Sequence, residues 1–142
     1  MSKSDVDQYI LDVLSGDQVA CKSVRQAVER QARDLTSSEN KDFPYYYDEK
    51  TAAAICDYFP AALRHSIGRH AGMRFELEPW QKFCISSIFG WKRRDNHCRR
   101  FRRVYWSMGR KNGKSSIAAG IAMLMASIDI NPYTNDAEAR AQ

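Results

Sequence analysis

Apolar side chains recur at three- and four-residue spacing in five stretches of the chain, which is the pattern of helices with one buried face. The first stretch follows a capping-box-like start at Ser4 and Asp7 and ends near Gly16. The second covers residues 24–35 and fades into a polar linker at residues 36–41. Together they predict a helical N-terminal segment, assigned to residues 1–40.

The third stretch follows Asp48 and continues to Phe59, where Pro60 is expected to kink or end the helix. The residues before it, 43–47, are predicted to be extended, because Pro44 biases the preceding residue away from helix.

The last two helical stretches, residues 79–91 and 115–127, flank a strand-like run at Phe101–Ser107. Pro79 opens the first of them, where a first helical turn tolerates proline. A parallel sheet needs several strands, and only one strong candidate is visible, so the chain is predicted to be mostly helical, marginally stable and prone to associate. The apolar stripes consist of Trp80, Phe83, Cys84, Ile88 and Trp91, and of Ile117, Ile121, Leu124 and Ile128.

The segment Ser107–Ser116 has the chemistry of a phosphate-binding turn between a strand and a helix. Backbone N–H groups at such a turn point inward, toward the positive end of the helix dipole. Gly113 lets the backbone approach the phosphates, Lys114 reaches the β and γ phosphates, and the Ser115 hydroxyl ligates Mg²⁺. The other predicted contacts are Gly109, Arg110, Lys111, Asn112 and Ser116.

The match to the phosphate-loop pattern is incomplete. The first glycine of G-x-x-x-x-G-K-S/T falls at Met108, and Gly109 comes one place late. A polar turn that happens to read Gly-Lys-Ser remains an alternative, although the flanking strand-like and helix-like runs favour the phosphate loop.

Gln81 lies in the first turn of the helix that begins at Pro79. Its side-chain amide carries both a donor group and an acceptor, the pair needed to read the N6 and N7 edge of adenine. The alternative is a capped amphipathic helix whose glutamine is only solvated.

In this order, the motifs Leu77–Gln81, Ile88–Trp91 and Gly109–Ser115, with a basic stretch between the last two, resemble the N-terminal ATPase region of tailed-phage terminase large subunits. With residues 48–72, which resemble the segment before the ATP site, the resemblance covers about residues 45–140.

The resemblance implies an α/β fold in residues 41–142, the front portion of a P-loop (Walker A) NTPase that binds ATP and Mg²⁺. It implies that Gln81 reads adenine, that Lys114 and Ser115 bind phosphate and Mg²⁺, and that Arg110 stabilises the γ phosphate as a cis arginine finger. General attraction of nucleotide is the alternative role for Arg110, and Lys111 is the weaker candidate for the finger.

Similar motors package double-stranded viral DNA into capsids in the host cytoplasm. The resemblance implies a small terminase subunit and a portal protein as further partners, and an oligomeric ring for the full-length protein only. Asp129 follows an apolar run but continues the helical period, so it does not predict the second, metal-binding strand. The Walker B acids and the nuclease domain are therefore expected to be absent, and the chain is expected to be inactive alone.

Charge is distributed unevenly along the chain. Residues 1–60 hold 7 Lys/Arg and 11 Asp/Glu (net −4), whereas residues 61–142 hold 15 and 6 (net +9). A basic cluster suits sequence-independent binding of phosphate backbones. The alternative is a solvated connector between helix and strand. The cluster consists of Lys92, Arg93, Arg94, Arg99, Arg100, Arg102 and Arg103.

Two further functions remain open, a helicase-like P-loop ATPase and a non-catalytic helical module that binds nucleic acid or another phage protein. The four cysteines show no metal-ligand spacing, and no apolar run reaches the ~20 residues that cross a bilayer. No membrane partner is therefore expected.

Overall fold

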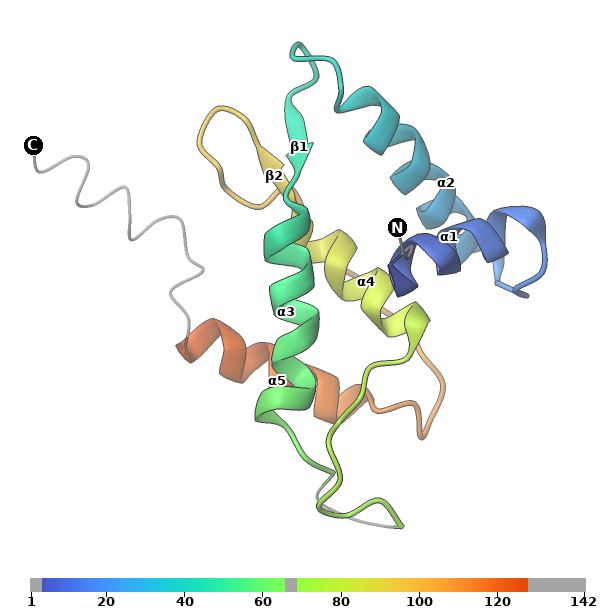
Figure 1. The fold of residues 1–142 in the computed structure, drawn as a ribbon, viewed down its shortest axis with the longest axis vertical. Coiled ribbons are helices and arrows are strands. Elements are labelled where there is room, and N and C mark those ends of the chain that lie inside the picture. The colour runs from blue at the N-terminus through green and yellow to red at the C-terminus, as the bar shows by residue number, and fades with distance from the viewer. Residues whose placement is uncertain (1–3, 66–68, 128–142) are drawn as a thin grey trace, which may run out of the picture.

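The computed structural model describes residues 4–65 and 69–127, which form five helices and two short strands (Figure 1). The elements in chain order are α1 (Asp5–Ser15), α2 (Lys22–Ser37), β1 (Tyr45–Tyr47), α3 (Glu49–Ala62), α4 (Pro79–Gly90), β2 (Trp91–Arg93) and α5 (Lys114–Ser127). No helix in these two ranges is long and apolar enough to span a bilayer.

Local capping explains where the first and third helices begin. The Ser4 side chain accepts a hydrogen bond from the backbone N–H of Asp7, and Gly16 ends α1 with a φ of 93°. Asp48 caps α3 by accepting from the N–H of Thr51 at 3.0 Å. Pro60 does not end α3, because the helix continues to Ala62.

The α4 helix lies at the centre of the described structure and contributes to two apolar cores. On one side Phe83 joins Ile10, Val13 and Val28 of α1 and α2. On the other side Ile85 and Phe89 of α4 pack with residues of α3, residues 75–77 and α5; this core contains Ile55, Cys56, Phe59, Phe75, Leu77, Ile117 and Leu124. Because α4 is covered on both sides, Phe83–Gly90 are all buried or half-buried. The sequence predicted one apolar face for this helix, whereas the structure buries more than one face.

The sheet is antiparallel and joins segments far apart in the sequence. Tyr45 pairs with Arg93 and Tyr47 pairs with Trp91. A hairpin continues it, because the N–H of Arg93 donates to Cys98 O at 2.8 Å and the N–H of Arg100 donates to Trp91 O at 2.9 Å. The extended conformation expected for residues 43–47 is confirmed for β1, whereas its pairing was not foreseen.

The strand predicted at Phe101–Ser107 is absent from the structure, and with it the parallel sheet. In the described ranges, no backbone hydrogen bond joins residues 101–112 to another backbone group. Val104 is 51 % exposed and Tyr105 is 94 % exposed. Residues with high β propensity form a strand only where a neighbouring strand can pair with them, and the described residues provide no such strand beside 101–107. The structure is mainly helical with a small two-stranded sheet, compatible with part of an α/β fold.

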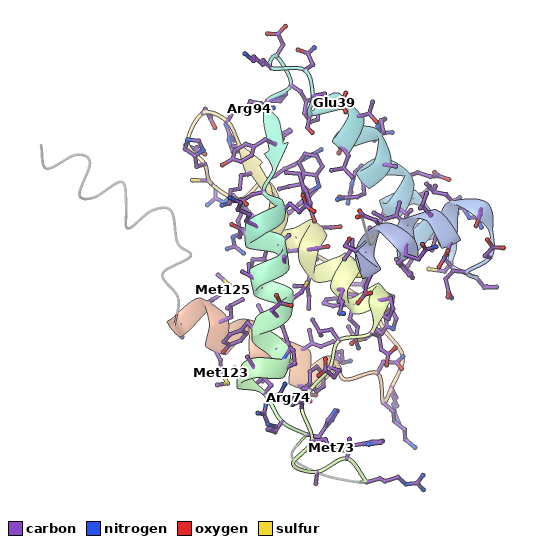
Figure 2. All side chains as sticks on the ribbon, in the orientation of Figure 1. Glu39, Met73, Arg74, Arg94, Met123 and Met125 are labelled. Carbon is purple, nitrogen blue, oxygen red and sulfur yellow. The ribbon has the colours of Figure 1, made fainter. Side chains whose placement is uncertain are left out.

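The α5 helix is only partly covered. Ile117 and Leu124 are buried, which confirms this part of the predicted stripe, and Ile121 is half-buried. Met123 and Met125 are 49 % and 44 % exposed and project from α5 beside the end of α3 (Figure 2). The fourth residue of the stripe, Ile128, and the acidic Asp129 lie outside the described residues.

Candidate functional site

The predicted phosphate loop, residues 109–113, leads directly into α5. Gly113 O accepts from the N–H of Ile117 at 2.8 Å, so the helix begins at Lys114. Gly113 has a φ of 75°, and a Cβ there would lie 3.2 Å from the Phe75 ring. Its positive φ therefore favours glycine, and a Cβ there would require the Phe75 ring to shift by a few tenths of an ångström.

The first turn of α5 presents the groups that an anion needs. The N–H groups of Lys114, Ser115 and Ser116 lie outside the helical hydrogen-bond ladder, at the positive end of the helix dipole. All three residues are exposed. Arg110 and Lys111 are also exposed, and Lys111 adopts a φ of 67°, which is strained for a residue with a Cβ. The loop thus offers three cationic side chains and a set of free donors to solvent.

Gln81 is buried rather than solvated. It is 4 % exposed, its Oε1 accepts from the N–H of Glu78 at 2.9 Å, and its Nε2 donates to Asn112 O at 3.2 Å. The first bond belongs to a capping box with Glu78, so the expected capped helix is confirmed. The structure therefore brings Gln81 to the phosphate loop, although both polar atoms of its amide already have partners within the chain.

A cavity of about 440 Å³ lies where α4 and the loop meet. It is lined by Trp80, Gln81, Lys111, Asn112 and Gly113, together with side chains that follow α3, among them His65, His70, Arg74 and Phe75. The sequence analysis gave no site role to these four, although His65 and His70 lie in residues 48–72, which it compared with the segment before the ATP site. The antiparallel bridge of Arg64 with Arg74 returns the chain to the loop, a contact that no local sequence pattern indicated.

A larger cavity of about 910 Å³ lies along the other side of Trp80. Its lining includes Phe83 of α4, Val24 and Ala27 of α2, and Trp106 and Gly109 of the segment that enters the loop. The Trp80 and Trp106 rings meet edge to face, with centroids 6.1 Å apart. The loop is therefore flanked by a cavity on each side of Trp80.

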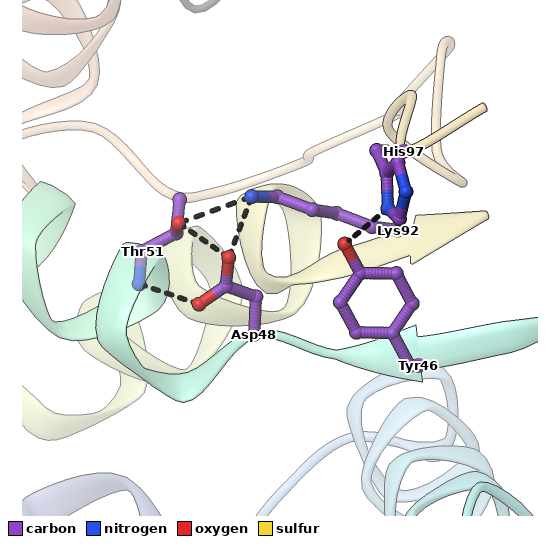
Figure 3. A network of polar contacts seen from close by, with 5 residues as sticks. All are labelled: Tyr46, Asp48, Thr51, Lys92 and His97. Atoms are coloured by element: carbon purple, nitrogen blue, oxygen red, sulfur yellow. Dashed lines mark hydrogen bonds and ion pairs between the residues drawn. The ribbon is translucent and has the colours of Figure 1, made fainter. Parts of the chain in front are cut away.

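Most of the basic cluster is engaged inside the chain. Lys92 Nζ lies 2.6 Å from Asp48 Oδ2 and donates to Thr51 Oγ1 at 3.1 Å (Figure 3). Burial raises the pKa of Asp48, but hydrogen bonds from Lys92 and Thr51 outweigh it, and the pKa falls to about 2. Nearby, Tyr46 Oη lies 2.9 Å from His97 Nδ1.

Arg100 is half-buried and lies among aromatic rings. Its Nη1 lies 2.8 Å from Asp34 Oδ2, an ion pair without an aligned hydrogen bond, and its guanidinium carbon is 4.2 Å from the Tyr45 ring centroid. Beside this pair, Trp91 Nε1 donates to Gln31 Oε1 at 2.7 Å in a buried position. These contacts tie α2 to β2 and the hairpin.

Three of the remaining cations make contacts within the chain, and two lie on the segment that leads to the loop. Arg94, labelled in Figure 2, donates to the carbonyls of Phe43 and Ser38. Arg93 pairs with Asp95, and Arg99 lies over the Phe89 ring. Arg102 and Arg103 are exposed on the segment that leads to the loop. The geometry favours a connector held by internal contacts, with only part of the predicted cluster displayed on the surface.

Two cysteines are unsuited to nucleophilic chemistry. Burial raises the pKa of Cys84 to about 12 and that of Cys56 to about 11, and the nearby Lys82 only partly offsets the effect on Cys56. Neither thiol is ionised near neutral pH. The chemistry of the described structure therefore centres on the loop.

Residues 79–139 match the family model described as terminase large subunit, ATPase domain. This segment belongs to the terminase large-subunit ATPase family. Comparisons with curated proteins and with solved structures gave no match. The terminase segment starts at the first residue of α4 and includes Gln81, the phosphate loop and α5. The described residues 4–65 and 69–78 lie outside it, including the part of residues 45–78 that the sequence analysis had compared with terminases.

Proposed function

We propose that residues 109–116 bind the triphosphate of ATP with Mg²⁺, as the ATP-binding part of a motor that packages double-stranded viral DNA. The observation that carries this proposal is the position of Gly113, at positive φ immediately before the first turn of α5, inside the segment that matches terminase ATPases. The fold proposed for the site is a P-loop that leads directly into α5.

Each residue has a defined role in the proposal. Lys114 neutralises the β and γ phosphates, and Ser115 Oγ ligates Mg²⁺. Backbone N–H groups of the loop and of Ser116 hold the remaining phosphate oxygens. Arg110, which is exposed beside the loop, stabilises charge at the γ phosphate.

The base is proposed to lie in the 440 Å³ cavity beside Gln81. Aromatic side chains of Trp80 and Phe75 line it, and such faces favour a planar base. Direct reading of adenine by Gln81 would require its bonds to Glu78 and Asn112 to be shared or exchanged.

The packaging role is proposed from the family. It includes action in the host cytoplasm on double-stranded viral DNA, with a small terminase subunit and a portal protein, and a ring in the full-length protein. ATP binding is the part of this role that the chain itself can test.

Calorimetry of the chain with ATP and MgCl₂ tests the proposal, with Lys114→Ala as the variant. We expect Lys114→Ala to weaken binding about tenfold or more, because a charge-assisted contact to phosphate is lost. Lys50→Ala, at an exposed lysine of α3, is the matched control and should leave affinity unchanged. Absence of ATP binding by the unmodified chain, or equal affinity in Lys114→Ala, would refute the proposal. The first of these results would favour the non-catalytic helical module.

A further inference from the structure

Gln81 joins the two elements that form the proposed nucleotide site. Its Oε1 closes the capping box at the start of α4, and its Nε2 donates to the carbonyl of Asn112 in the loop. One rigid amide thus connects a helix N-terminus to the backbone of the phosphate loop.

This connection is the main polar attachment of the loop. Within residues 103–112, the described structure shows one hydrogen bond to a helix, the bond from Gln81 Nε2 of α4 to Asn112 O. The amide is 4 % exposed, and a buried polar group left without its partner costs about 1–3 kcal/mol. Because Asn112 itself is exposed, replacing Gln81 removes one hydrogen bond without leaving its partner buried.

The attachment acts at the point where the loop becomes a helix. Asn112 precedes Gly113, whose φ of 75° sets the direction in which α5 leaves. A Cβ at Gly113 would lie 3.7 Å from Gln81 Nε2, so the same amide also packs against the following residue. The orientation of the N–H groups of α5 thus depends on where Gln81 holds the loop.

The burial of Gln81 leaves little surface for a base. Reading adenine needs an acceptor for N6–H and a donor to N7 on an accessible edge. Here the carbonyl oxygen accepts from Glu78, one of the two N–H groups of Nε2 donates to Asn112, and both atoms lie in a residue that is almost fully covered.

We propose that Gln81 is a positioning residue of the phosphate loop, acting on the triphosphate through Asn112 and Gly113 instead of selecting the base. The inference rests on the proposed nucleotide binding by residues 109–116. If Gln81 positions the loop, changing it should weaken binding of the triphosphate. If Gln81 reads the base, changing it should weaken binding of ATP and leave that of tripolyphosphate as it is.

The test measures the affinities of the chain and of Gln81→Met for ATP, GTP and inorganic tripolyphosphate, each with MgCl₂. We expect the variant to bind all three more weakly by a similar factor of about fivefold, the equivalent of one lost hydrogen bond. The preference for ATP over GTP should stay as it is in the unmodified chain.

Loss of ATP affinity with unchanged tripolyphosphate affinity would overturn the inference, because it would place the effect of Gln81 on the base. Unchanged affinity for all three ligands would overturn it equally. If the unmodified chain bound none of them, the failure would belong to the proposed function itself.

Two controls separate positioning from loss of fold. Gln26→Met makes the same change at an exposed glutamine of α2 and should leave all three affinities unchanged. Hydrogen exchange should show faster exchange at residues 117–120, whose N–H groups make the first helical bonds of α5, in Gln81→Met, with α1–α3 unchanged; protection of this turn equal to that of the unmodified chain would contradict the proposed role.

If Gln81→Met unfolds, Gln81→Glu replaces it. This variant keeps an oxygen to accept from the N–H of Glu78 and removes the donor to Asn112. A selective loss of ATP affinity contradicts positioning. Because the new carboxylate also repels phosphate, a parallel loss of ATP and tripolyphosphate affinity supports positioning only when hydrogen exchange at the first turn of α5 also becomes faster.

Discussion

The helical body, residues 4–65 and 69–100, and the loop region, residues 101–127, are held by different kinds of contact. The body has capped helices, a paired sheet, and buried polar links such as Gln31–Trp91 and Asp34–Arg100. The contacts that join the loop region to it include the bond from Gln81, the Trp80–Trp106 contact, Arg30 over the Phe101 ring and the apolar side chains on one side of α5.

This difference separates stability from ligand binding in the molecule. Body contacts connect segments far apart in the sequence, so losing one should weaken the whole body. The loop region has few attachments, and regions of this kind open at low free-energy cost. The proposed anion site lies in the loop region. Loss of one contact there is expected to change the geometry of the loop without unfolding the body.

The largest expected effect comes from breaking the buried ion pair of the body. Arg100→Met leaves Asp34, which is 6 % exposed, with only its longer ion pair to the exposed Arg33, at 3.7 Å, and should lower the free energy of unfolding by about 3 kcal/mol. Urea denaturation measures this loss. The double variant Asp34→Leu with Arg100→Met should recover much of it, since no unpaired charge then remains; a double variant as unstable as the sum of both single changes would contradict the pairing.

A smaller and more local effect is expected from Gly113→Ala in the loop region. The left-handed φ costs a residue with a Cβ about 1–2 kcal/mol, and contact with Phe75 adds to it. Hydrogen exchange should become faster in α5 while α1 and α2 remain protected. Gly109→Ala is the structural control, because its φ is not positive and its Cβ would meet only the Asn112 side chain, at 3.3 Å. Equal loss of protection in α1 would show that the two regions are not separable.

The smallest effect concerns pH and the joint between β1 and α3. The folded pKa of Asp48 is about 2, below its ordinary 3.8, so its carboxylate stabilises the fold above about pH 4. That contribution is lost as the pH falls toward 2, by about 1 kcal/mol because the pair is partly exposed. This loss can be measured as the free energy of unfolding, by denaturant titrations between pH 5 and pH 2. Asp48→Asn should flatten this part of the profile, and an unchanged slope would remove Asp48 as its cause.

The helices could be predicted because their signals are local. Ser4, Asp48 and Pro79 mark helix starts through contacts within one turn, and the structure places α1, α3 and α4 there. The start of α5 after Gly113 followed from the same kind of signal. Site roles for Arg110, Lys114 and Ser115 remain predictions about a ligand.

The contacts that were not predicted depend on distant segments. Nothing near Tyr45 indicates that it pairs with Arg93, and nothing near Arg100 indicates a carboxylate from α2. Gln81 was expected to face either adenine or solvent, because its partner Asn112 comes much later in the chain. The strand at residues 101–107 was wrong for the opposite reason: its local propensity was right, but a strand also needs a neighbour.

The three tryptophans fall on the two sides of this boundary and make the protein its own optical reporter. Trp91 is 1 % exposed with its indole bonded to Gln31, so its emission follows the unfolding of the body. Trp80 and Trp106 face each other across the junction at 6.1 Å, close enough for their ring transitions to couple in near-ultraviolet circular dichroism. Departure of the loop from α4 can therefore be recorded in unlabelled protein, separately from loss of the surrounding fold.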